Sequence, residues 1–65
     1  MDYNSKAAFV VKELVQHSAE LREDLIHLLS LLDPSFQKKG TEAMENVTKA
    51  ETLLRELHQA LSFKQ

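Results

Sequence analysis

Near the middle of this 65-residue sequence stands the stretch Leu31-Leu32-Asp33-Pro34-Ser35, which no single regular helix can cross. Proline lacks a backbone N–H and disfavours the helical conformation in the residue before it, so a helix arriving from the N-terminal side should end near Leu32. Asp33 can cap a second helix whose first position, Pro34, needs no partner for its own nitrogen. The stretch therefore predicts two helices joined by a very short turn.

Apolar residues follow the same spacing on both sides of the turn. On the N-terminal side, steps of four and three residues run through Ala7, Val11, Leu14, Ser18, Leu21, Leu25, Leu28 and Leu32. On the C-terminal side, the same alternation runs through Phe36, Gly40, Ala43, Val47, Ala50, Leu54, Leu57 and Leu61. This spacing places side chains along one side of an α-helix. We expect an all-α fold, an antiparallel two-helix hairpin with heptad patterning, in which the two stripes pack against each other.

The expected hairpin is one domain over residues 1–65, with a first helix over about 5–32, a turn at 33–34 and a second helix over about 34–62. Reflection about Pro34 pairs Leu28 with Gly40 and Ser18 with Ala50. A glycine inside a helix costs about 1 kcal/mol relative to alanine, and a break after Gly40 is the alternative. Because the heptad spacing passes through Gly40 unshifted, we predict a continuous second helix.

A further set of apolar side chains lies outside these two stripes. One partner helix covers only one side of a helix, so this surplus needs another surface to pack on. We predict that a protein-interaction surface is formed by Val15, Ala19, Ile26, Leu29, Leu31, Met44 and Leu53.

The chain is short for a fold that must be stable by itself. A domain of this size buries little apolar surface, and disulfides are excluded because the sequence has no cysteine. The missing burial is most simply supplied by a second hairpin. We therefore expect two copies to dimerise into a four-helix bundle.

Charged residues exclude several classes of partner. The net charge is −2, with basic and acidic residues interspersed, which argues against a nucleic-acid or anionic-membrane surface. Glu45 with Lys49 and Glu51 with Arg55 have the spacing of ion pairs on a helix, which we expect on the solvent-facing side. No apolar run approaches 18 residues and no secretory signal is evident, so we expect a cytoplasmic protein.

The residue types of the common catalytic and metal sites are sparse. The three histidines, His17, His27 and His58, have no recognised metal-ligand spacing. Cysteine is absent, and no serine stands in a glycine-flanked turn. We expect no catalytic residue, no metal, no cofactor and no small-molecule substrate.

Two functions remain, and both bind proteins. The first is a small non-enzymatic regulator or structural protein that works as a homodimeric helical hairpin, with itself and another protein as partners. The second is an adaptor or chaperone hairpin that binds an amphipathic helix of a different protein. In layout, the second is similar to the small hairpin co-chaperones of secretion systems, which shield a partner's helix.

Overall fold

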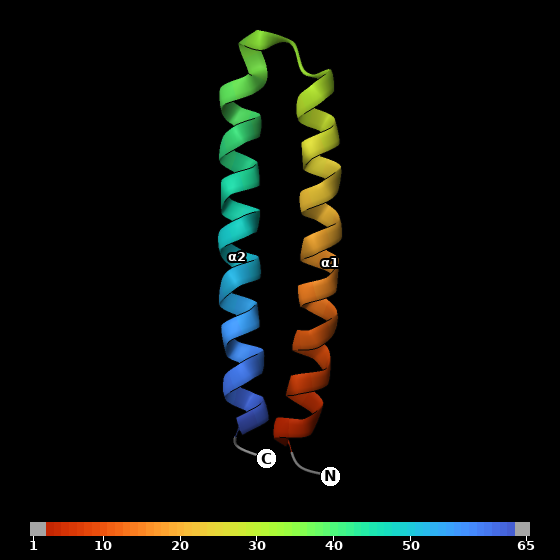
Figure 1. The fold of residues 1–65 in the computed structure, drawn as a ribbon, viewed down its shortest axis with the longest axis vertical. Coiled ribbons are helices and arrows are strands. Elements are labelled where there is room, and N and C mark those ends of the chain that lie inside the picture. Colours follow the sequence, from red (N-terminus) through yellow and green to blue (C-terminus); the bar gives the residue numbers. More distant parts are fainter. Residues whose placement is uncertain (1–2, 64–65) are drawn as a thin grey trace.

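The computed structural model describes residues 3–63 of the chain, and the side chains of residues 5–63. Helix α1 spans Tyr3–Leu31, a short 3-10 helix η1 spans Pro34–Phe36, and helix α2 spans Gln37–Phe63. The two long helices lie side by side and antiparallel, so that the start of α1 and the end of α2 meet at one end (Figure 1). The backbone measures 50 × 14 × 12 Å. The predicted helical hairpin is confirmed, and the described residues include no strand.

The turn differs from the prediction in its capping. The chain passes through a single 3-10 turn before α2 begins, and the side chain of Asp33 makes no capping hydrogen bond. Instead the backbone carbonyl of Asp33 accepts from the N–H of Phe36 at 2.8 Å. The expected carboxylate cap is therefore wrong, and α2 begins at Gln37, three residues after the start predicted at about residue 34.

Gln37 closes the C-terminal end of α1 across the turn. Its Nε2 donates to the carbonyl oxygens of Leu29 at 2.8 Å and of Leu32 at 3.0 Å. The last carbonyls of a helix lack partners within the helix, so a side chain from the following segment satisfies them here. This contact fixes the first turn of α2 against the last turn of α1.

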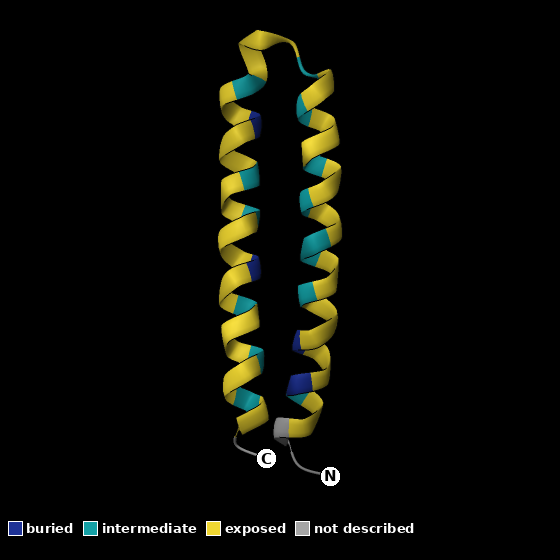
Figure 2. Cartoon of the chain, in the orientation of Figure 1, coloured by how far each residue is buried: buried dark blue, intermediate teal, exposed yellow. Residues whose placement is uncertain are grey.

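The hairpin interface differs from the predicted stripes by one residue at every second position. On α1 and at its C-terminal end, the partly or fully buried positions include Ala8, Val11, Val15, Ser18, Arg22, Leu25, Leu29 and Leu32. On α2 they include Gln37, Gly40, Met44, Val47, Glu51, Leu54, His58 and Leu61. Figure 2 shows these positions facing each other along the whole hairpin. Alternate members of each predicted stripe are therefore right, and the members between them are each replaced by the next residue in the sequence.

Gly40 lies inside α2 without interrupting it, as predicted. A Cβ at this position would come within 2.7 Å of Leu29 Cδ2 and 2.8 Å of Leu32 Cδ1. The residues opposite Gly40 are thus Leu29 and Leu32, and the predicted pairing with Leu28 is wrong. The small residue allows the helices to approach closely next to the turn.

The hairpin buries few apolar side chains by itself. Among the described residues, only Ala8 at 9% exposure and Val11 at 7% form a buried hydrophobic core. No large apolar side chain in this part of the chain is fully buried. Neither helix, as far as it is described, contains an apolar stretch of the length needed to cross a bilayer.

Candidate interaction surface

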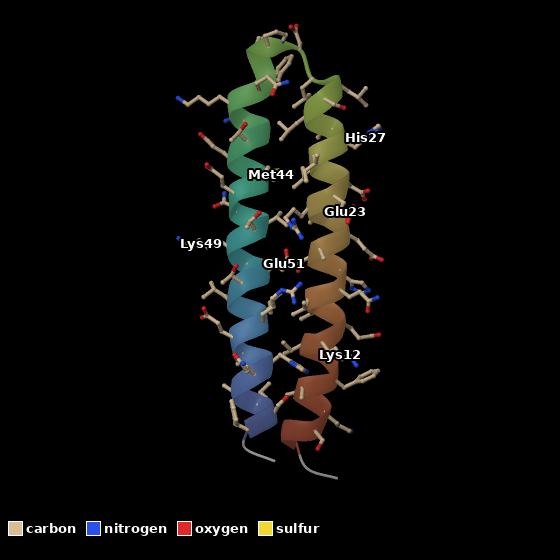
Figure 3. The ribbon with its side chains drawn as sticks, in the orientation of Figure 1. Lys12, Glu23, His27, Met44, Lys49 and Glu51 are labelled. Atoms are coloured by element: carbon tan, nitrogen blue, oxygen red, sulfur yellow. The ribbon has the colours of Figure 1, made fainter. Side chains whose placement is uncertain are left out.

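A buried carboxylate joins the two helices near their middle. Glu51 of α2 is only 6% exposed and lies between the helices (Figure 3). Its Oε1 accepts from Arg22 Nε of α1 at 2.9 Å. Its Oε2 accepts from Arg55 Nη2 at 2.7 Å and from Arg55 Nε at 3.2 Å. The sequence predicts the Glu51–Arg55 pair on the solvent-facing side; in the structure Arg55 is exposed there, while Glu51 itself is buried in the hairpin interface.

These two guanidinium groups set the ionisation of Glu51. Hydrogen bonds from Arg55 lower the pKa of the carboxyl group, and the hydrogen bond and charge of Arg22 lower it further. Burial acts in the opposite direction but is outweighed, so the pKa lies below its ordinary value of 4.5. The cluster consequently favours the ionised form of Glu51.

Ser18 and Ala50 do not face each other, contrary to the predicted pairing. Ser18 is half-buried, and its hydroxyl donates to the carbonyl oxygen of Val15 in its own helix at 2.9 Å. Ala50 is exposed. The residue of α2 that faces α1 at this level is Glu51, one position further along.

The predicted positions that the next residue replaces at the interface form an uncovered apolar stripe on each helix. On α1, Leu14, Leu21 and Leu28 are 42%, 49% and 43% exposed. On α2, Ala43 and Ala50 are exposed, and Leu57 is 48% exposed. We call these six residues the leucine face.

The two stripes of the leucine face lie on the same side of the hairpin. Each member directly precedes an interface residue, as Leu21 precedes Arg22 and Ala50 precedes Glu51, and so lies about 100° around its helix from that residue. The offset has the same sense on both helices. Because the helices run antiparallel, equal rotations about the two axes bring both stripes to one side.

Three further apolar side chains lie along the outer edges of this face. Val10 and Leu31 on α1 and Leu53 on α2 precede the interface residues that alternate with those behind the leucine face. Their exposed fractions are 54%, 70% and 57%. Their greater exposure agrees with positions further from the neighbouring helix. The apolar surface is therefore widest near the ends of α1.

The seven predicted interaction residues do not form one surface. Three of them, Val15, Leu29 and Met44, are half-buried at hairpin-interface positions, and Leu29 is next to Gly40. Leu31 and Leu53 are exposed at the edges of the leucine face. Ala19 is half-buried and Ile26 is 49% exposed, and both follow interface residues, which places them on the opposite side.

The opposite side of the hairpin is mostly polar. Its exposed positions include Thr41, Thr48 and Arg55. A shallow depression on this side is lined by Lys12, Val15, Arg55, His58 and Gln59. Arg55 already binds Glu51, so the remaining polar side chains that line the depression are Lys12, His58 and Gln59. Ile26 is an isolated large apolar side chain on this side.

The outward positions carry charged and polar side chains. Glu23 and His27 project from α1 away from α2, and Lys49 projects from α2 away from α1 (Figure 3). Within residues 3–63, no group of three or more His, Cys, Asp or Glu side chains could hold a metal ion. Comparisons with protein families, curated proteins and solved structures found no match to this chain.

Sequence reasoning missed the role of the leucine face. Its members were assigned to the hairpin interface, because an apolar heptad stripe does not say which neighbouring helix covers which side. The one sequence signal is that Arg22 and Glu51, which directly follow Leu21 and Ala50, carry opposite charges, but the two residues are 29 positions apart and no local pattern pairs them.

Proposed function

We propose that this protein is a small non-enzymatic interaction module that works as a homodimer. In this proposal, the leucine face of one hairpin packs against the leucine face of a second copy, giving a four-helix bundle. The outward charged positions and the polar side remain available to other proteins. The observation that carries the proposal is the exposure of three leucines on α1 and one on α2 along a single side.

The small core of the hairpin supports the need for a partner. A hairpin whose buried hydrophobic side chains are Ala8 and Val11 removes little apolar surface from water, which is the main favourable term in folding. Leucine side chains that are about half exposed can each contribute roughly 1 kcal/mol or more of favourable free energy when a partner covers them. Dimerisation would add this burial without any change in the hairpin.

The dimensions of the hairpin side that carries the leucine face agree with a stable interface. The backbone is 50 Å long and 14 Å wide, so this whole side projects to roughly 700 Å². Each partner in a standard protein–protein interface contributes about 800 Å². A second hairpin of equal length therefore matches the face in size without leaving a long apolar segment uncovered.

Sedimentation equilibrium of the purified chain over a wide concentration range tests the proposal. The expected mass is twice the chain mass of 7.4 kDa, with dissociation only on dilution. A well-folded monomer at all concentrations would contradict self-association. The leucine face would then be a surface for an amphipathic helix of a different protein, which is the adaptor function.

A further inference from the structure

We infer that the two copies pack antiparallel, α1 against α1 and α2 against α2, with their turns at opposite ends of the bundle. This inference rests on the homodimer proposed above and specifies its geometry. It is carried by the size and charge of the residues along the outer edges of the leucine face. The edge of α1 contains Val10, His17, Asp24 and Leu31, and the edge of α2 contains Lys39, Asn46, Leu53 and Ala60.

A two-fold axis perpendicular to the helices determines which residues meet. Each residue on one side of the axis meets the residue equally far on the other side in the second copy. With the axis at Leu21, this leucine meets its own counterpart, and Leu14 meets Leu28 of the second copy. Leucines thus oppose leucines along the whole α1 contact.

The same axis passes through Ala50 on α2. Leu21 and Ala50 precede Arg22 and Glu51, which are joined by a hydrogen bond of 2.9 Å, so they lie at about the same height in the hairpin. Ala50 therefore also meets its counterpart. The central layer contains two leucines and two alanines, which fill the middle of a bundle with complementary sizes.

The outer edge of α1 becomes complementary in this register. His17 and Asp24 of the second copy lie opposite each other to within one residue, about 1.5 Å along the helix, and so do Val10 and Leu31 of the second copy, each twice by symmetry. Within the described part of the hairpin, neither His17 nor Asp24 takes part in an ion pair. An imidazole N–H can donate to the carboxylate, and the two apolar side chains cover each other.

Neighbouring registers lack this complementarity. Moving the axis by half a heptad toward the N-terminus places His17 against its own counterpart and Asp24 against Val10. Moving it equally toward the turn places Asp24 against its own counterpart, where two like charges meet. The edge residues thus select the axis at Leu21.

The other symmetric arrangement is also less complementary. A two-fold axis parallel to the helices would place both turns at one end and pack α1 against α2 of the second copy. Leu21 would then meet Ala50, while His17 would meet Leu53 and Leu31 would meet Lys39. These two contacts set polar groups beside leucine side chains, as Asn46 beside Leu53 does with the perpendicular axis, so the arrangements are distinguished by the His17–Asp24 pair, which only the perpendicular axis forms.

Cysteine crosslinking distinguishes the two arrangements, because the chain has no cysteine of its own. Leu21→Cys and Ala50→Cys each introduce one thiol close to the inferred axis. A disulfide requires Cα atoms roughly 4.4–6.8 Å apart, so only thiols that meet across the interface should join readily. Under mild oxidation, each variant alone should form a covalent dimer at least about tenfold faster than Ile26→Cys, whose thiol lies on the opposite side.

The other outcomes separate this inference from the homodimer itself. Efficient crosslinking only between Leu21→Cys and Ala50→Cys in a mixture would overturn the inferred geometry and leave the homodimer standing. A wild-type chain that sediments as a monomer would overturn the homodimer and the inference together. A wild-type dimer with no crosslink in any combination would mean that a different face associates.

A charge change at position 17 provides a second readout in the intact chain. His17→Lys should lower the dimer dissociation constant by roughly two- to fivefold at low salt, because two exposed Lys–Asp pairs form by symmetry. His17→Glu should raise it, because two carboxylates then face each other. If both variants weaken the dimer equally, position 17 lies against an apolar residue and the inferred register is wrong.

Discussion

Arg22 and Glu51, which are 29 residues apart in the sequence, are joined by a hydrogen bond of 2.9 Å between Nε and Oε1. This contact sets the alignment of the two helices near the middle of the hairpin. It also fixes the orientation of each helix about its own axis. With Arg22 and Glu51 at the interface, the residues before them, Leu21 and Ala50, are left uncovered. An interhelical ion pair with a buried carboxylate and a 36% exposed Arg22 side chain therefore accompanies the uncovered Leu21 and Ala50.

Glu51 should make stability depend on pH on the acidic side. Its pKa is lowered in the folded protein, so its contribution is fully present above the ordinary value of 4.5 and is lost as the pH falls through the folded value. Glu51→Gln should reduce stability at pH 7 and flatten the acid limb of the stability curve. Thermal unfolding between pH 2 and 7, roughly the window where carboxyl groups titrate, measures both effects.

The matched control for this variant is Glu56→Gln, which removes an exposed carboxylate from the same helix. We expect it to change stability by no more than about 0.5 kcal/mol. Equal pH dependence in the two variants would show that Glu51 is not specifically stabilised in its ionised form.

Gln37 should be important for the junction of the helices. Gln37→Ala removes two hydrogen bonds to the carbonyl oxygens of Leu29 and Leu32, which should lower the free energy of unfolding by about 1–2 kcal/mol. Lys38→Ala, at the next and exposed position, should have little effect. Urea titrations at one fixed protein concentration compare the variants, and equal midpoints would contradict the assigned role.

Gly40 should not tolerate a large side chain. Gly40→Leu would meet the tips of Leu29 and Leu32, and such overpacking should cost about 1–3 kcal/mol. Thr41→Leu places the same leucine side chain at the neighbouring, exposed position and should change stability by about 0.5 kcal/mol or less. If Gly40→Leu is as stable as Thr41→Leu in the same titration, the helices do not approach as closely as described.

The two helices and the turn could be predicted because their signals are local. Pro34 interrupts a regular helix whatever the rest of the chain does. Apolar residues spaced by three and four positions indicate a helix with one apolar side. Continuity through Gly40 followed from the same spacing. These features depend on neighbouring residues in the sequence and not on which surface is buried.

The orientation of each helix about its axis could not be predicted in the same way. Leu21 and Arg22 are adjacent, and hydrophobicity alone assigns Leu21 to the interface. The structure places Arg22 there, where its guanidinium donates a hydrogen bond to Glu51 on the other helix. An ion pair between the helices depends on two residues that are distant in the sequence, so the local pattern around one of them does not show the other.

Leu21 and Ile26 provide the most direct test of the leucine face, because both are 49% exposed and they lie on opposite sides of the hairpin. Leu21→Glu and Ile26→Glu add the same charge at equal initial exposure. Burying an unpaired carboxylate is costly, so only the first should prevent association.

The decisive measurement is the mass of these two variants and the wild type by sedimentation equilibrium at one concentration. We predict a mass near the single-chain value of 7.4 kDa for Leu21→Glu, and twice that value for Ile26→Glu and the wild type. A Leu21→Glu variant that remains dimeric, or an Ile26→Glu variant that dissociates instead, would contradict the leucine face as the surface of self-association.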